Sequence, residues 1–245
     1  MNLFIKNISQ LVTIAANGER VKTGRAMRDL GILNDAGVLC QGGKIAWVGC
    51  MKDWNGKLEE DVTVIDAGEC VVLPGFVDSH THMMFAGDRS KEFALRSQGA
   101  TYQQIAEAGG GILNTIVHVR AASKRDLKRQ TVRYLMEMMK HGTTTVEIKS
   151  GYGLDVASEI KMMEAIHELK NEEMMTVVPT FIGAHAVPPE FKQNRKGYVD
   201  LVVNEMIPYV GRKKLASFCD VFCEKGYFEL EESERILMAG KNAGM

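Results

Sequence analysis

Residues 73–82 read LPGFVDSHTH, and this stretch decides the predicted fold. A Pro-Gly turn leads into a short apolar run, which ends in a polar tip containing His80 and His82. Alternate side chains of an extended strand point the same way, so imidazoles at i and i+2 can share one metal ion. Neutral imidazole suits zinc or ferrous iron. The alternative interpretation is two polar residues in a loop, because a His-x-His pair alone is a weak signal.

Downstream of this stretch the sequence alternates between strand-like and helix-like segments. Strands are expected at 76–81, 143–148, 174–182 and around 221–223, and helices at 114–140, 156–169, 197–207 and 230–239. Pro208 is expected to end the third of these helices, because proline restricts the residue before it. Such alternation predicts a parallel sheet with right-handed crossovers.

The number of these units limits the architecture. The 245-residue chain leaves 172 residues after position 73, which is too short for eight β/α units of roughly 30 residues each. The sequence therefore predicts an α/β fold containing the first half, about four units, of a TIM-like (β/α)8 barrel. The histidine pair would lie at the C-terminal end of the first barrel strand, the face on which barrels build active sites.

Residues 1–73 differ from the rest of the chain. Short runs rich in β-branched and apolar residues, broken by Asn-Gly and Gly-Gly turns, predict strands at 3–5, 11–14, 37–40, 44–48 and 62–66. The run at 38–48 predicts a hairpin around 41–43. We expect a β-rich segment over 1–73 and a partial barrel over 74–245.

Composition excludes several classes of protein. With 45% hydrophobic residues the chain is not disordered, and a net charge of -1 gives no general attraction to nucleic acid or anionic membranes. No apolar run approaches the roughly 18 residues of a membrane span, and the first residues lack a signal-peptide pattern. Five cysteines without framework spacing suit reduced thiols. We expect a cytoplasmic protein with no nucleic-acid or membrane partner.

The stretch at 73–82 resembles the first barrel strand of the metal-dependent amidohydrolases, whose β-sandwich is built from segments on either side of the barrel. Five further motifs resemble the imidazolonepropionase family within them: GDRSKEF (87–93), GATY (99–102), AGGGI (108–112), TTVEIKSGYGL (144–154) and FIGAHAVP (181–188). The resemblance implies hydrolytic ring opening of 4-imidazolone-5-propanoate to N-formimino-L-glutamate in histidine degradation. It also implies one zinc or iron ion, held in part by His80 and His82.

The same resemblance assigns substrate contacts to Arg89, Tyr152 and His185. The Arg89 guanidinium is a planar fork suited to a carboxylate arm, although a single Arg is usually a solvated surface charge. Tyr152 lies between two glycines after the second strand, where a tyrosine packed on a core edge is the alternative. His185 follows the third strand; beside a hydrolytic metal it could polarise a ring carbonyl or hold the leaving nitrogen. Tyr102 is a weaker candidate.

Other polar residues carry less information. Glu147 and Lys149 alternate on the second strand and are candidates for supporting the site, and Glu224 is a low-grade polar candidate. His118, His141 and His167 are interpreted as structural, since they lie within or at the end of expected helices.

The resemblance also implies a further histidine, an acidic metal ligand and a general acid/base carboxylate on strands that would follow Met245. The catalytic acid/base is therefore unidentified, and we expect an N-terminal part that is inactive without the remainder. Half a barrel is expected to associate through its exposed edges, for example as a homodimer. Two alternatives stay open: another amidohydrolase, such as a cyclic amidine deaminase or cyclic-amide hydrolase, and a non-catalytic interaction fragment.

Overall fold

A computed structural model describes residues 2–16, 18–101, 104, 110–172 and 174–245. The chain divides into two compact units, Met1–Gly75 and Phe76–Met245. Each unit has its own sheet and its own buried core, so the two are described separately.

The first unit is a mixed sheet with strand order β3-β2-β1-β4, and β5 also pairs with β1. Its strands are β1 (Asn2–Val12), β2 (Ile32–Gln41), β3 (Lys44–Cys50), β4 (Val62–Asp66) and β5 (Val71–Val72), with short 3-10 helices at Gly24–Arg28 and Met51–Asp53. The hairpin predicted around 41–43 is confirmed: Gln41 pairs with Lys44, and both intervening glycines have positive φ, as a tight hairpin turn requires. The runs expected as separate strands at 3–5 and 11–14 form one strand, because an irregularity between Ile5 and Ile8 lets β1 continue.

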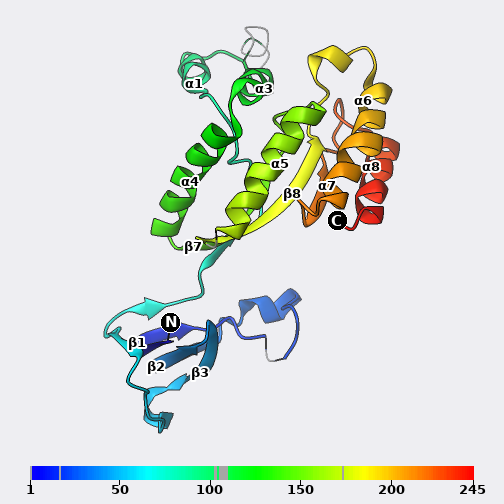
Figure 1. Ribbon diagram of the computed structural model, residues 1–245. Helices are drawn as coiled ribbons and strands as arrows, with labels where there is room; N and C mark the ends of the chain where they lie inside the picture. The colour runs from blue at the N-terminus through cyan, green and yellow to red at the C-terminus, as the bar shows by residue number, and fades with distance from the viewer. Residues whose placement is uncertain (1, 17, 102–103, 105–109, 173) are drawn as a thin grey trace. The chain divides into compact units, whose positions relative to one another are not determined.

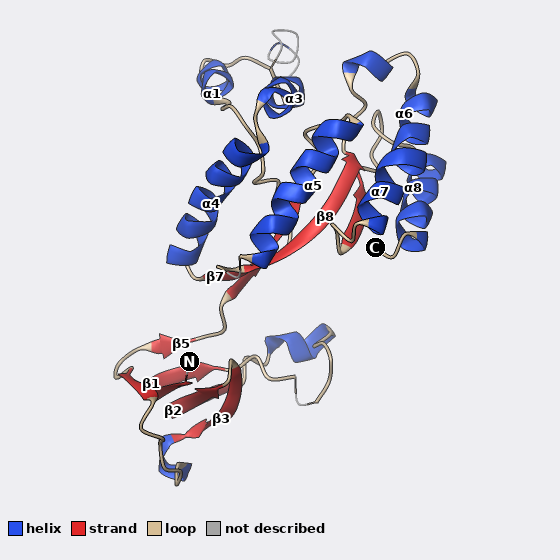
Figure 2. Ribbon diagram, viewed as in Figure 1, coloured by secondary structure: helices blue, strands red, loops and turns tan. Residues whose placement is uncertain are grey.

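The second unit is built on four parallel strands in the order β6-β7-β8-β9. These are β6 (Phe76–Asp78), β7 (Thr143–Lys149), β8 (Thr176–Ala184) and β9 (Phe218–Val221). Helices α4 (Lys124–Lys140), α5 (Val156–Asn171), α7 (Ile207–Arg212) and α8 (Leu230–Asn242) run alongside the strands (Figures 1 and 2), and α1 (Ser90–Ser97) lies in the long β6–β7 connection. This curled parallel half-barrel confirms the predicted fold class.

The two faces of β7 have different roles. Val146 and Ile148 are fully buried and belong to the same core cluster as Met162 and Ile166 of α5. Burying such a side chain stabilises the fold by about 1.5–3 kcal/mol. Because side chains alternate along a strand, Glu147 and Lys149 lie on the opposite face.

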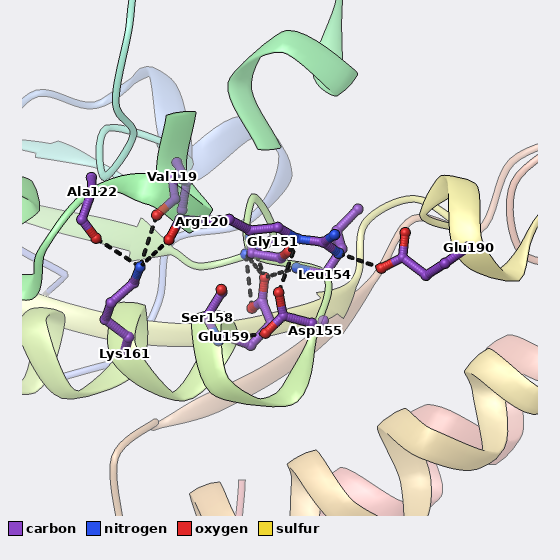
Figure 3. A network of polar contacts seen from close by, with 12 residues as sticks. Val119, Arg120, Ala122, Gly151, Leu154, Asp155, Ser158, Glu159, Lys161 and Glu190 are labelled. Carbon is purple, nitrogen blue, oxygen red and sulfur yellow. Dashed lines mark hydrogen bonds and ion pairs between the residues drawn. The ribbon is translucent and has the colours of Figure 1, made fainter. Parts of the chain in front are cut away.

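The helix expected over 114–140 is two helices, α3 (Ile112–Ala121) and α4. Ser123 has extended dihedral angles, and its side chain accepts a hydrogen bond from the Asp126 amide. This N-cap starts a new helix, because the Ser123 side chain takes the place of the backbone carbonyl that would accept from the Asp126 amide in a continuous helix. The Lys161 ammonium then donates to three carbonyls at the end of α3, those of Val119, Arg120 and Ala122 (Figure 3).

The prediction that Pro208 ends a helix at 207 is wrong. The helical path runs through α6 (Arg195–Leu201), a wide π-helical turn at Val202–Met206 and then α7 to Arg212. Pro208 occupies the first turn of α7, directly after the π-helical turn, and the helical path continues through it. Among the described residues, no helix has the length and apolar character needed to cross a membrane.

Candidate metal and substrate site

His80 and His82 lie in the 79–82 segment, the residues that directly follow β6. The strand ends at Asp78, earlier than expected, so the histidines are not within it. Thr81 nevertheless holds the segment against β7: its carbonyl accepts from the Lys149 amide at 3.0 Å, and its hydroxyl donates to the Glu147 carbonyl at 2.6 Å. The two imidazole centroids are 5.4 Å apart, so the pair is brought together without a regular strand.

His82 is in the form that a metal ion binds. Burial, followed by the nearby His185 and His80, lowers the pKa of His82 to about 4, so its ring is neutral at pH 7. Its Nδ1 is buried, and no hydrogen-bond partner for it lies among the residues that the structure describes. A buried polar atom of this kind is costly unless something completes it, and a metal ion or a substrate group would do so.

The residues present fit a metal ion only in part. In the described ranges, no group of three or more His, Cys, Asp or Glu side chains is arranged to hold a metal. A hydrolytic zinc usually takes three protein ligands and a water. Two neighbouring imidazoles, one with an unpartnered buried nitrogen, supply part of such a set.

Tyr152 and His185 are brought to the same place from two further strands. Tyr152 lies in the 150–154 turn, which follows β7 and reads SGYGL, and His185 follows β8. The His185 ring stacks on His82 with centroids 4.4 Å apart and an interplanar angle of 12°. The Tyr152 ring centroid is 5.5 Å from that of His82 and 5.3 Å from that of His185. Three of the candidate site residues therefore form one aromatic cluster.

The hydrogen bond of His185 fixes which nitrogen carries the proton. Its Nδ1 lies 2.9 Å from the Gly151 carbonyl oxygen, and because a carbonyl only accepts, Nδ1 must donate. Burial lowers the pKa of His185, which favours the neutral ring. The remaining nitrogen, Nε2, is then an acceptor. Such a ring is suited to an N–H or O–H of a ligand, and less suited to a developing oxyanion.

Arg89 shares a cavity with this cluster. A small cavity of about 140 Å³ is lined by His82, Arg89, Asn114 and Tyr152, among others. The Arg89 Nε and Nη2 atoms lie 2.7 and 2.5 Å from one oxygen of Glu92, a buried carboxylate that also accepts from the Gly111 amide. Burial raises the pKa of the Tyr152 phenol, and the Arg89 charge opposes this effect. Tyr152 is therefore a protonated donor beside a cation.

Glu147 and Lys149 belong to a polar cluster on the same face of the sheet. The Lys149 ammonium lies 2.9 Å from Glu147 and 2.8 Å from Asp220, and Thr180 donates to Glu147 at 2.5 Å. Burial alone would lower the pKa of Lys149, but the two carboxylates raise it above its ordinary value. Asp220 and Thr180 were missed by the sequence reasoning, although each is a polar residue in or beside an expected strand.

Glu224 is exposed and accepts from the adjacent Lys225 amide. Tyr102 lies outside the described residues.

Glu159 was also missed, although it carried a detectable signal. It is fully buried and accepts hydrogen bonds from amides of the 150–154 turn. In the sequence it occupies the first position of an i, i+3, i+4, i+7 series with Met162, Met163 and Ile166. A carboxylate on the apolar stripe of a helix indicates a buried polar contact.

The chain is similar over its whole length to curated proteins. The chain is 46% identical over 247 residues to the imidazolonepropionase of Symbiobacterium thermophilum, a match that covers 100% of this chain and 57% of that protein. It is 43% identical over 250 residues to the imidazolonepropionase of Alkaliphilus oremlandii, covering 100% of this chain and 58% of the relative. The chain thus spans a little over half the length of these curated relatives. No protein-family model matches it.

Solved structures show the same fold at low sequence identity. Guanine deaminase of E. coli aligns with a TM-score of 0.65 and 11% identity, over 99% of this chain and 50% of that one. Ochratoxinase of A. niger aligns with a TM-score of 0.59 and 16% identity, over 98% of this chain and 53% of that one. At these identities the likeness concerns the fold alone.

Proposed function

We propose that this chain, which is related over its whole length to the imidazolonepropionases, recognises 4-imidazolone-5-propanoate and supplies part of the site that hydrolyses it to N-formimino-L-glutamate. The observation that carries the proposal is the shared cavity of His82, Arg89 and Tyr152, with His185 stacked on His82. A metal ligand, a cation, a phenol donor and an imidazole acceptor meet there. These groups match a small ring that bears a carboxylate arm.

Each side chain has a separate task in this proposal. Arg89 faces the propionate, with Glu92 fixing the direction of its guanidinium. Tyr152 donates a hydrogen bond, and the Nε2 of His185 accepts one from a ring N–H, which together hold the ring in register. His80 and His82 hold one zinc or iron ion in part, and that ion when bound would activate a water for attack on the ring carbonyl. Further ligands and the general acid/base are expected from elsewhere in the enzyme.

The test uses the 245-residue chain alone and the same chain joined to the remaining part of the Symbiobacterium thermophilum relative. With zinc or iron added, we expect ring opening by the joined protein and little by the chain alone, because two imidazoles are fewer ligands than a hydrolytic metal needs. In the joined protein, Arg89→Ala should lower kcat/KM for the carboxylate-bearing substrate about 100-fold, on the order of one lost charge-assisted contact of about 3 kcal/mol.

Arg129→Ala is the matched control, since Arg129 pairs with Asp126 on the surface of α4 and its loss should leave kcat/KM unchanged. Ring opening by the chain alone at ordinary enzyme rates would contradict the proposal of a partial site. Equal kcat/KM for the Arg89→Ala and Arg129→Ala proteins would contradict the carboxylate contact. A panel of cyclic amidines and cyclic amides without a carboxylate separates the alternative amidohydrolase activities, which should not depend on Arg89.

The remaining properties are proposed on the same basis. We expect a cytoplasmic enzyme with a small-molecule substrate, whose metal, zinc or iron, is identified by elemental analysis of the joined protein. Residues 1–73 would belong to its β-sandwich and 74–245 to its barrel. A homodimer stays a prediction, and sedimentation of the purified chain would check it.

A further inference from the structure

Glu159 is a buried carboxylate aimed at the 150–154 turn. It lies in the first turn of α5 and has no exposed surface. Its oxygens accept from the amides of Gly151 at 3.0 Å, Gly153 at 2.8 Å and Leu154 at 2.9 Å (Figure 3). Burial raises the pKa of Glu159, while these amide hydrogen bonds oppose the rise. One side chain therefore satisfies three backbone donors of a single turn.

The turn needs such an anchor because its backbone conformation is unfavourable. Gly151 has φ +95°, and Leu154, which is not a glycine, has φ +53°. A non-glycine residue is strained in this region and persists there only where its surroundings hold it. Gly153 also packs against α5 so closely that an added Cβ would lie 2.6 Å from the Glu159 backbone nitrogen. The turn is pressed onto the start of the helix that carries its acceptor.

The 150–154 turn, held in this way, fixes the positions of two candidate substrate contacts. Tyr152 is part of it, and the carbonyl of Gly151 accepts the Nδ1–H of His185. Gly151 donates its amide to Glu159 and offers its carbonyl to His185, so one residue links the buried carboxylate to the imidazole.

We propose that Glu159 is a positioning residue: by holding the amides of the 150–154 turn, it places Tyr152 and keeps His185 protonated at Nδ1, with Nε2 as an acceptor. This role rests on the proposed function only in that Tyr152 and His185 are taken as substrate contacts. The device itself, a carboxylate that sets an imidazole tautomer through a backbone turn, does not require a substrate to be present.

The experiment reads the tautomer directly in the 245-residue chain. Side-chain ¹⁵N signals of His185 should show a protonated Nδ1 and an unprotonated Nε2. In Glu159→Ala the turn loses its acceptor, so both nitrogen shifts should move toward the averaged values of an exchanging ring. Leu135→Ala is the matched control, because it removes a buried side chain of α4 and should leave the His185 pattern unchanged.

Glu159→Gln provides a second variant should the alanine protein not fold. An amide keeps one oxygen for Gly153 and Leu154 but turns an NH2 group toward the Gly151 amide, which the second carboxylate oxygen accepts at 3.0 Å. We expect a shifted Gly151 amide signal and a smaller shift of the His185 nitrogens.

The proposal is overturned if the His185 nitrogens are unchanged in a folded Glu159 variant, or if Leu135→Ala shifts them equally. These outcomes are independent of the proposed function. Failure of the joined protein to open the imidazolone ring, together with a His185 response to Glu159, would remove the function and leave the positioning role supported.

Discussion

The 79–82 segment and the 150–154 turn occupy equivalent places in the half-barrel, each following a parallel strand, yet they are held very differently. The 150–154 turn is buried, carries two glycines with no room for a side chain and has three amides on one carboxylate. The 79–82 segment is fixed through Thr81, while His80 is exposed and the buried Nδ1 of His82 finds no partner within the described part of the chain.

This difference separates two parts of a site. The contacts proposed for a ligand's ring are organised by residues close in sequence to the turn, and such organisation lowers the entropy lost on binding. The metal side depends on groups that the described residues do not complete.

The largest expected loss of stability comes from adding a side chain to Gly151 in the 150–154 turn. In Gly151→Ala the new Cβ would lie 2.8 Å from an Ile182 methyl and 2.9 Å from the His185 Cβ, at a φ of +95°. The strained dihedral and the overpacking together should lower the free energy of unfolding by about 2–5 kcal/mol, measured by urea denaturation.

Gly226→Ala isolates the dihedral contribution of that substitution. Gly226 has a similar φ of +88° but no atom within 4 Å of an added Cβ, so about 1–2 kcal/mol is expected. Equal losses in the two variants would mean that the 150–154 turn is not tightly packed, and the contrast with the 79–82 segment would disappear.

The next largest loss of stability is expected on β7, which Thr81 of the 79–82 segment contacts and which the 150–154 turn follows. Lys149→Met removes a buried ammonium from between Glu147 and Asp220, leaving two carboxylates without their cation. Because Asp220 is partly exposed, we expect a loss of about 2–3 kcal/mol in the free energy of unfolding, below that of a fully buried pair.

Lys128→Met is the control for that substitution, since its pairs with Glu168 and Glu172 lie on the helical surface and should contribute under about 1 kcal/mol. Thermal and urea unfolding of both variants would decide the matter. A Lys149→Met protein as stable as Lys128→Met would show that the polar face of β7 does not support the site.

The smallest effect concerns the metal side. The chain should bind zinc weakly, and His80→Ala or His82→Ala should each weaken that binding at least tenfold, or about 1.4 kcal/mol. His118→Ala should not, because that exposed ring bonds the Asn114 carbonyl within its own helix. Competition with a chromophoric chelator measures all three. Unchanged affinity in both the His80 and His82 variants would refute the proposed pair.

Local patterns predicted most of the fold. The alternation of β-branched runs with apolar helical stripes predicts the parallel half-barrel, and the glycines at 42 and 43 predict the hairpin. The errors in helix bounds arise where a second local feature outweighs the first. Ser123 divides a continuous apolar stripe because its side chain caps a new helix, and Pro208 stays in a helical path because a π turn precedes it.

The residues of the candidate site were predictable, but the hydrogen bonds that hold them in place were not. Sequence motifs selected His82, Arg89, Tyr152 and His185, and the structure brings them together. The place of Glu159 on an apolar helix stripe indicates that it is buried, but its partners are not readable there, because it meets them only when the helix folds against the preceding turn. The pair of Arg89 and Glu92 is local, with the two residues three positions apart in the chain.

The π turn at Val202–Met206 changes what an engineer should alter in the last helices. It holds one residue more than a regular turn, which sets the register that places Ile207 and Val210 in the core. Each residue of an α-helix advances the side chains by about 100°, so removing one residue there would rotate all of α7 and turn its apolar side outward. A change in length at this turn therefore disturbs the packing of α7 on the core.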